Sequence, residues 1–251
     1  MINPADLRAH TEEVVRLSYS KAPSWLPPAV GLLIRAGSHA YGCALPTSDI
    51  DLRGVCVAPK GAYLGFHTFE RFAPENPDTE ILDLRVFMRN AAGGDLQALQ
   101  MLFCYPEDIV HAEGFGVVLR TYRNSFLSQK VVKPMAGYVR GMLAKLRNAV
   151  AKGIDQNVGK DAMHALRVTR MLHEVLVDGR LNIRRHHDAD ELVAIRLAPQ
   201  DALIHGQRAE DLLAHLPHWK AQTSLPEEPN FQVLDALCVS LIEKSLYPSR
   251  G

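Results

Sequence analysis

Two aspartates separated by one residue, Asp49 and Asp51, have the side chains in this sequence best suited to chemistry. They begin a stretch that predicts a β-strand, and strand side chains two positions apart lie on the same face. Two carboxylates on one face repel each other and are costly to desolvate together, so they require solvent, a proton or a cation. Mg²⁺ takes oxygen ligands and typically uses one or two carboxylates together with substrate phosphates. The aspartates therefore predict a site for a hard divalent cation.

A Gly-Ser pair, Gly37 and Ser38, precedes the aspartates, with ten residues between Ser38 and Asp49. It follows an apolar run, residues 30–34, which predicts a strand. Small residues at this point let backbone N–H groups approach a phosphate closely, and a helix beginning at Ser38 would present its positive end to that phosphate. Arg53, on the same predicted strand face as the aspartates, meets a phosphate or neutralises the carboxylates, or it forms a structural ion pair.

The Gly-Ser pair, the ten-residue spacer and the Asp-x-Asp pair together resemble the nucleotidyltransferases of the DNA polymerase β superfamily. Residues 37–42 and 48–55 are similar to one branch of it, the predicted nucleotidyltransferases associated with RNA repair (the RlaP-like, or YcgL-like, family). Residues 83–102 and 160–180 resemble the same branch, so the resemblance extends over most of residues 30–215. It implies transfer of a nucleoside monophosphate from a nucleoside triphosphate, with release of pyrophosphate.

In the chemistry that the resemblance implies, Mg²⁺ or Mn²⁺ bound by Asp49 and Asp51 activates a hydroxyl for in-line attack on the α-phosphate. The family pattern also requires a third carboxylate on a neighbouring strand. Asp83 fits best because apolar residues flank it, Glu80 is the rival, and Asp78 is a weaker candidate. Strand alternation places Glu80 and Asp83 on opposite faces, so only one of them is expected to reach the metal. Asp83 has an alternative role as the N-cap of the next helix.

Lys160, His164 and Arg167 recur at the spacing of one helical face, which Met171 continues. If this face meets the predicted site, Lys160 and Arg167 bind the triphosphate or the phosphates of the acceptor, and His164 orients or contacts a phosphate. The alternative is a solvated polar stripe. A second basic group, residues 184–187 (Arg-Arg-His-His), suggests contact with a polyanion.

The balance of 28 basic and 28 acidic residues conceals an uneven distribution. Residues 116–187 contain 14 Lys and Arg against 4 Asp and Glu, an excess of ten positive charges that the rest of the chain offsets. Such a segment suits a nucleic acid or a triphosphate, although solvated helix faces have the same composition. Together with the RNA-repair resemblance, it makes a tRNA-like RNA end the expected acceptor. The alternatives are nucleotidylation of a protein or small molecule, and a non-catalytic RNA-binding adaptor.

The bulk composition is that of a water-soluble globular protein, with 47% hydrophobic and 22% charged residues in 251. No apolar run approaches the roughly 18 residues of a membrane span, and the acidic N-terminal stretch is unlike a secretory signal. The four cysteines form no Cys-x-x-Cys pair, so we expect neither a zinc site nor a disulfide framework. The expected compartment is the reducing cytoplasm.

The predicted strands are concentrated in the first hundred residues, at 30–36, 49–58 and 79–82. Helices are predicted at 5–17, 84–92, 96–103, 115–127, 134–152, 157–178, 188–196, 208–216 and 230–245. This order predicts an α+β fold, in which a small polymerase-β-type nucleotidyltransferase domain with a mixed sheet precedes an all-helical C-terminal domain. The expected limits are 1–110 for the catalytic domain and 111–251 for the helical domain, which would bind the acceptor or nucleotide.

Overall fold

A mixed sheet of five strands forms the N-terminal part of the computed structural model, which describes residues 3–75, 77–154 and 156–247. The strands are β1 (Val30–Arg35), β2 (Leu52–Cys56), β3 (Arg71–Phe72), β4 (Thr79–Asp83) and β5 (Ile109–Ala112). Their order across the sheet is β3-β4-β2-β1-β5. β1 is antiparallel to both β2 and β5, and β3 is antiparallel to β4, whereas β2 and β4 are parallel.

The strand β1, which lies between β2 and β5, is buried because helices cover both faces of the sheet. Its first five residues, Val-Gly-Leu-Leu-Ile, are all buried. Alternation sends Leu33 into the smaller apolar cluster, which includes Val14 of helix α1 (Pro4–Ser20). Leu32 and Ile34 lie in the larger cluster, with the helices of the other face. A strand buried on both faces needs such a near-continuous apolar run.

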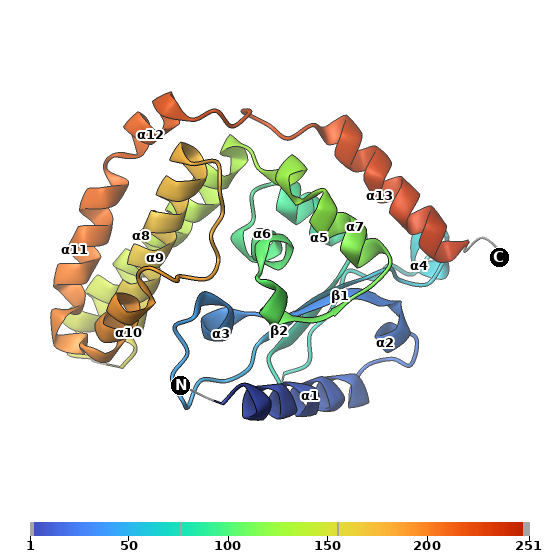
Figure 1. The fold of residues 1–251 in the computed structure, drawn as a ribbon, viewed down its shortest axis with the longest axis horizontal. Helices are drawn as coiled ribbons and strands as arrows, with labels where there is room; N and C mark the ends of the chain where they lie inside the picture. The colour runs from blue at the N-terminus through green and yellow to red at the C-terminus, as the bar shows by residue number, and fades with distance from the viewer. Residues whose placement is uncertain (1–2, 76, 155, 248–251) are drawn as a thin grey trace.

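The helices divide into those that cover the sheet and those that form a separate group (Figure 1). Helices α5 (Leu84–Ala92), α6 (Leu96–Phe103) and α7 (Phe115–Thr121) cover the face opposite α1. The helical group comprises α8 (Val132–Ala151), α9 (Val158–Val177), α10 (Ala189–Leu197) and α11 (Ala202–Leu213). The shorter helices are α2 (Leu26–Ala29), α3 (Gly37–Tyr41), α4 (Gly61–Leu64) and α12 (Leu216–Gln222).

Helix α9 is the centre of the helical group, because 14 of its 20 residues are buried. α8, α10, α11 and α12 all pack against it. The last helix, α13 (Phe231–Leu246), crosses back to the sheet region and packs on α5 (Figure 1). Within the described part of the chain, none of these helices combines the length and the apolar character needed to span a membrane.

The predicted fold class is confirmed, since a mixed sheet precedes a helical region. The strand predicted over 49–58 is shorter than expected, because β2 begins only at Leu52 and both aspartates precede it. β3 and β5 were not predicted, since their two and four residues are too few to show an alternating pattern.

The predicted domain boundary at residue 110 would divide strand β5, and the return of α13 onto α5 joins the end of the chain to the sheet region. The outer limits of the two predicted domains, residues 1–2 and 248–251, lie outside the described residues. The helix predicted over 208–216 is observed as the end of α11 and the start of α12.

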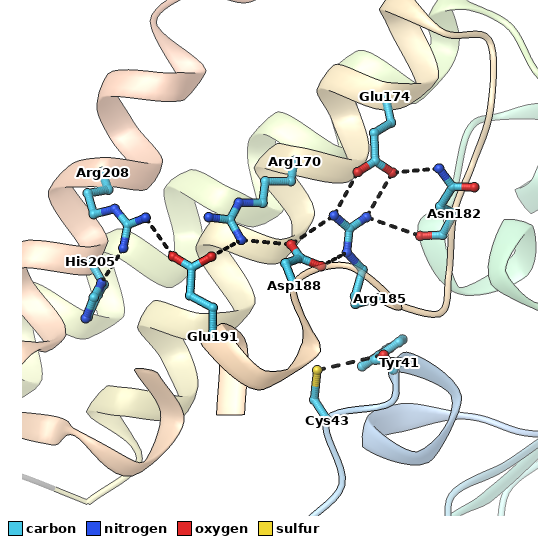
Figure 2. Close-up of polar contacts among 10 residues, drawn as sticks. All are labelled: Tyr41, Cys43, Arg170, Glu174, Asn182, Arg185, Asp188, Glu191, His205 and Arg208. Carbon is cyan, nitrogen blue, oxygen red and sulfur yellow. Dashed lines mark hydrogen bonds and ion pairs between the residues drawn. The ribbon is translucent and has the colours of Figure 1, made fainter. Parts of the chain in front are cut away.

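A chain of ion pairs fastens the loop between α9 and α10 to the helical group (Figure 2). The buried Arg185 is held by Glu174 at 2.7 Å and by Asp188 at 2.9 Å. Arg170 then bridges Asp188 and Glu191, each at 2.8 Å. Despite burial, hydrogen bonds from Arg185 and Arg170 hold the pKa of the Asp188 carboxyl below its ordinary value. Removal of one partner from such a network leaves the remaining charges uncompensated.

Arg185→Met is expected to lower the free energy of unfolding by about 3 kcal/mol, because Glu174 loses its cation and Asp188 loses one of two. Arg208→Met is the matched control, since it breaks a more exposed pair with Glu191, at 2.7 Å, which contributes at most about 1 kcal/mol, and a hydrogen bond to His205 at 3.0 Å. Urea denaturation followed by circular dichroism measures both losses. Equal losses in the two variants would contradict the structural role assigned to Arg185.

Candidate active site

A cavity of about 300 Å³ lies where the segments around α3 and before β2 meet the helical group. Seven of the residues that the sequence singled out line this cavity: Gly37, Ser38, Asp49, Asp51, Arg53, Lys160 and His164. They come from two stretches that lie far apart in the sequence, so the packing of the helical group on the sheet region creates the site.

Gly37 lets the backbone lie directly against the aspartates. Its φ of 62° is in the left-handed region, and a Cβ at this position would lie 1.8 Å from Asp51 Oδ2. Both conditions require glycine. Ser38 follows it in the first turn of α3, and the N-cap residue, Ala36, makes no side-chain hydrogen bond to that turn. Backbone N–H groups of the turn therefore lack a side-chain cap at the point where the cavity opens.

Asp51 and Asp78 lie together because the parallel strands β2 and β4 begin at the same end of the sheet. The Leu52 N–H donates to the Asp78 carbonyl oxygen at 2.9 Å. Burial, the charge of Asp78 and a hydrogen bond between the two carboxyl groups raise the pKa of Asp51 to about 6. Despite burial, a hydrogen bond from Arg53, at 2.8 Å, holds the pKa of Asp78 below its ordinary value. Asp49 lines the same cavity.

Asp83 is not the third carboxylate of this group, and the structure corrects that prediction. Asp83 pairs with Cys56 at the far end of the β2–β4 ladder, whereas Asp78 lies at its start. It is fully buried, caps α5 by accepting from the Arg85 N–H at 3.0 Å, and accepts from the Tyr63 hydroxyl at 2.6 Å. Its N-cap role, the alternative that the sequence left open, is the one observed.

Glu80, the rival candidate, lies opposite Arg53 in the parallel ladder. It does not line the cavity, and its carboxylate forms an ion pair with Arg71 at 3.1 Å. Asp78 does not line the cavity either, but it is two residues earlier in the same segment and its carboxyl group contacts that of Asp51. Asp78, the weakest of the three candidates from the sequence, is therefore the carboxylate that the strand register places next to Asp51.

The donor set fits a hard divalent cation that is bound together with phosphate. Among residues 3–75, 77–154 and 156–247, no group of three or more His, Cys, Asp or Glu side chains is arranged to hold a metal ion unaided. The carboxyl groups of Asp51 and Asp78 are nevertheless in contact, and this contact contributes to the raised pKa of Asp51. Mg²⁺ typically takes one or two carboxylates and completes its octahedron with water and substrate phosphates.

The helical group contributes a cationic lining to the cavity. Lys160 and His164 lie one turn apart on α9, and Arg196 reaches the cavity from α10 while donating to the Cys43 carbonyl oxygen at 3.2 Å. Burial, followed by the charges of Arg167 and Lys160, lowers the pKa of His164 to about 3. Five further residues that the sequence did not single out also line the cavity: Thr47, Gln97, Gln100, Tyr138 and Arg196.

Arg167 is not among the lining residues, although the same helical face predicted it as a nucleotide ligand. Its side chain is 2% exposed, and the guanidinium lies over the Tyr41 ring, 3.6 Å from the centroid. The structure therefore assigns it to the packing between α9 and α3, one layer removed from the cavity.

Many of the basic residues in 116–187 are paired within the fold. In the group 184–187, Arg184 reaches Asp108 at 2.7 Å and Arg185 belongs to the ion-pair chain of Figure 2, so the predicted polyanion contact is left to the two exposed histidines. Other basic residues in ion pairs are Lys130, Lys145, Arg147 and Arg170. Among described residues, those exposed and outside any ion pair are Arg123, Lys133, Arg140, Lys152, Lys160 and Arg180.

Comparison with known proteins finds similarity to an uncharacterised 38.9 kDa protein of the nrdC-mobD intergenic region of Enterobacteria phage T4, 30% identical over 122 residues. That match covers 43% of this chain and 36% of the phage protein, so it spans about a third of the relative's length. Among solved structures, a nucleotidyltransferase-like protein from Exiguobacterium sibiricum aligns with 94% of this chain and 78% of its own, at 14% identity and a TM-score of 0.30.

The family comparison covers most of the chain. Residues 28–240 match the family described as RlaP, the RNA repair pathway DNA polymerase beta family. This range contains the Gly-Ser pair, all the acidic residues of the cavity and the cationic face of α9. The chain belongs to the RNA repair pathway DNA polymerase beta family.

Proposed function

We propose that the protein transfers a nucleoside monophosphate from a nucleoside triphosphate to an acceptor hydroxyl, with Mg²⁺ or Mn²⁺ as the metal and pyrophosphate as the second product. The strongest support is that one cavity combines the acidic side chains of Asp49 and Asp51 with Gly37, Ser38 and Lys160. Carboxylates suit the metal, and small residues and a cation suit the phosphates. A volume of about 300 Å³ is at the lower end for a site that binds a small ligand.

Asp51 and Asp78 are the residues that would hold the metal, with Asp49 beside them. When bound, the metal supplies Lewis-acid activation of the attacking hydroxyl and neutralises charge on the phosphates. The chain contributes two carboxyl groups that are held in contact. A divalent cation bound between them would neutralise their repulsion. Arg53, which donates to Asp78, keeps that carboxylate ionised and oriented.

The remaining residues of the cavity position the phosphates. The Ser38 hydroxyl and the N–H groups of the first turn of α3 donate to phosphate oxygens, which Gly37 allows to approach the backbone. Lys160 supplies a positive charge against the pyrophosphate as it leaves. Catalysis on this plan rests on positioning and charge stabilisation, with no protein nucleophile.

The acceptor we propose is an RNA end. Helix α8 places Lys133 and Arg140 on its exposed surface without ion pairs in the described structure, and Tyr138 of the same helix lines the cavity. A polyanionic strand that follows α8 would therefore lead to the site. The family's association with RNA repair supports the same acceptor.

Asp49→Asn and Asp51→Asn are each expected to lower transfer by at least about 100-fold, because each removes a charge that the metal and triphosphate require. The melting temperature of Asp51→Asn should not fall, since the change relieves repulsion with Asp78. The assay incubates the protein and Mg²⁺ with each of the four α-labelled ribonucleotides, with and without total RNA. Label on protein alone would favour a protein-modifying enzyme, and bound RNA with no label would favour an RNA-binding adaptor.

Asp78→Asn and Asp83→Asn form a matched pair that tests the third carboxylate. Asp78→Asn should reduce transfer at least about 100-fold with little change in stability, because its side chain is exposed apart from its contacts with Asp51 and Arg53. Asp83→Asn should cost about 1–3 kcal/mol of stability, since it weakens a helix cap and a buried hydrogen bond, and the folded fraction should retain transfer. The opposite pattern would restore Asp83 as the metal ligand.

A double variant, Lys133→Gln with Arg140→Gln, should weaken RNA binding and reduce the slope of log affinity against log salt by about 2, because two phosphate contacts are lost. Transfer at saturating RNA should change little. The control is Arg16→Gln with Lys244→Gln, on α1 and α13, which removes the same charge elsewhere. An equal loss of RNA affinity in both double variants would exclude α8 as the specific path.

A further inference from the structure

Arg167 is a buried cation for which the described residues provide no carboxylate. Its side chain is 2% exposed, and Nε has no hydrogen-bond partner. Nη1 lies 3.2 Å from the Met171 sulfur and Nη2 lies 3.4 Å from His164 Nδ1. Burying a guanidinium with such weak partners is costly, and an apolar side chain of similar length would fill the space more favourably. The presence of a charged side chain at this costly position therefore suggests that Arg167 has a functional role.

The chemistry of the guanidinium decides the state of His164. An arginine can only donate hydrogen bonds, so Nδ1 of His164 must accept and carries no proton. The ring proton is then on Nε2. Because His164 lines the cavity, the ring offers the site an uncharged N–H donor in one fixed tautomer.

The same guanidinium also touches the helix that carries Ser38. Its central carbon lies 3.6 Å from the centroid of the Tyr41 ring, and Tyr41 is the last residue of α3. The Tyr41 hydroxyl donates to Gln100 at 3.0 Å, and its carbonyl oxygen accepts from the Arg185 N–H at 2.9 Å. Arg167 thus contacts both His164 on α9 and Tyr41 at the end of α3, the helix whose first turn we propose to bind phosphate.

We propose that Arg167 is a positioning residue that holds His164 as a neutral Nε2–H donor to a phosphate oxygen of the nucleoside triphosphate and holds α3, through Tyr41, at the distance that this contact requires. This proposal rests on the proposed function of the cavity. It differs from a direct role for Arg167 in binding the nucleotide, because Arg167 does not line the cavity.

Four cations near His164 favour the neutral ring. Arg167 and Lys160 lie on its own helix, Lys145 approaches from α8 with its partner Asp161, and Arg196 approaches from α10. Tyr41 contributes an uncharged ring from α3. Burial and these cations place the pKa of His164 far below its ordinary value. A neutral donor avoids adding a further charge to a site that already contains several.

The test is ¹⁵N NMR of the histidine rings of the full chain, without nucleotide, from pH 8 to pH 4.5. In the unmodified protein, His164 is expected to give the Nε2–H tautomer throughout and to show no titration. In Arg167→Met, the tautomer should become mixed and the ring should begin to titrate within this pH range. Arg167→Lys, which can still donate to Nδ1, should restore the single tautomer.

A kinetic measurement tests whether the tautomer of His164 affects binding of the nucleoside triphosphate. Arg167→Met should raise the KM for the nucleoside triphosphate about tenfold and lower kcat less, because one hydrogen bond to a charged group is lost. An Nδ1–H tautomer or a titration near pH 6.5 in the unmodified protein would overturn the proposal even if no variant folded. If the tautomer is found but no triphosphate binds, the proposal for phosphate contact fails together with the proposed function, and the role of Arg167 in fixing His164 stands.

Discussion

Two carboxyl groups that repel each other, those of Asp51 and Asp78, are the constraint around which this site is built. They are forced together because β2 and β4 are parallel and begin at the same end of the sheet. Their repulsion raises the pKa of Asp51. The hydrogen bond from Arg53 to Asp78 compensates only part of this repulsion. Gly37 lies against Asp51, at a position where a Cβ would clash with the Asp51 carboxylate. An unfavourable arrangement of charges that the surrounding backbone maintains is typical of a functional site.

The helical group is positioned against this acidic corner by contacts that converge on α3 and the residues after it. Arg167 stacks on the Tyr41 ring, the Arg185 N–H donates to the Tyr41 carbonyl oxygen, and Arg196 donates to the Cys43 carbonyl oxygen. The ion pairs of Arg185 in turn hold its own loop in place (Figure 2). Lys160 and His164 face the aspartates as a result. A site with acid from the sheet and cations from α9 suits a ligand that brings metal and phosphate together.

The sequence predicted the parts of the site that local rules determine. A fixed spacing identified Gly37, Ser38, Asp49 and Asp51, and helical periodicity identified Lys160 and His164. The choice of Asp83 over Asp78 failed because it depended on where β4 begins, and the observed register is a property of the whole sheet. Periodicity could not separate His164 from Arg167 either, since one face of α9 meets both the cavity and the packed ring of Tyr41. The lining residues of α6, α8 and α10 have no local pattern and become visible only in the folded chain.

A crystal structure with Mn²⁺ and a non-hydrolysable nucleoside triphosphate, with the metal located by its anomalous scattering, tests the central claim most directly. We predict manganese within coordination distance of Asp51 and Asp78, with phosphate oxygens completing its ligands next to Gly37 and Ser38. Manganese at Asp83, or a triphosphate bound away from the cavity with no metal near Asp51, would contradict it.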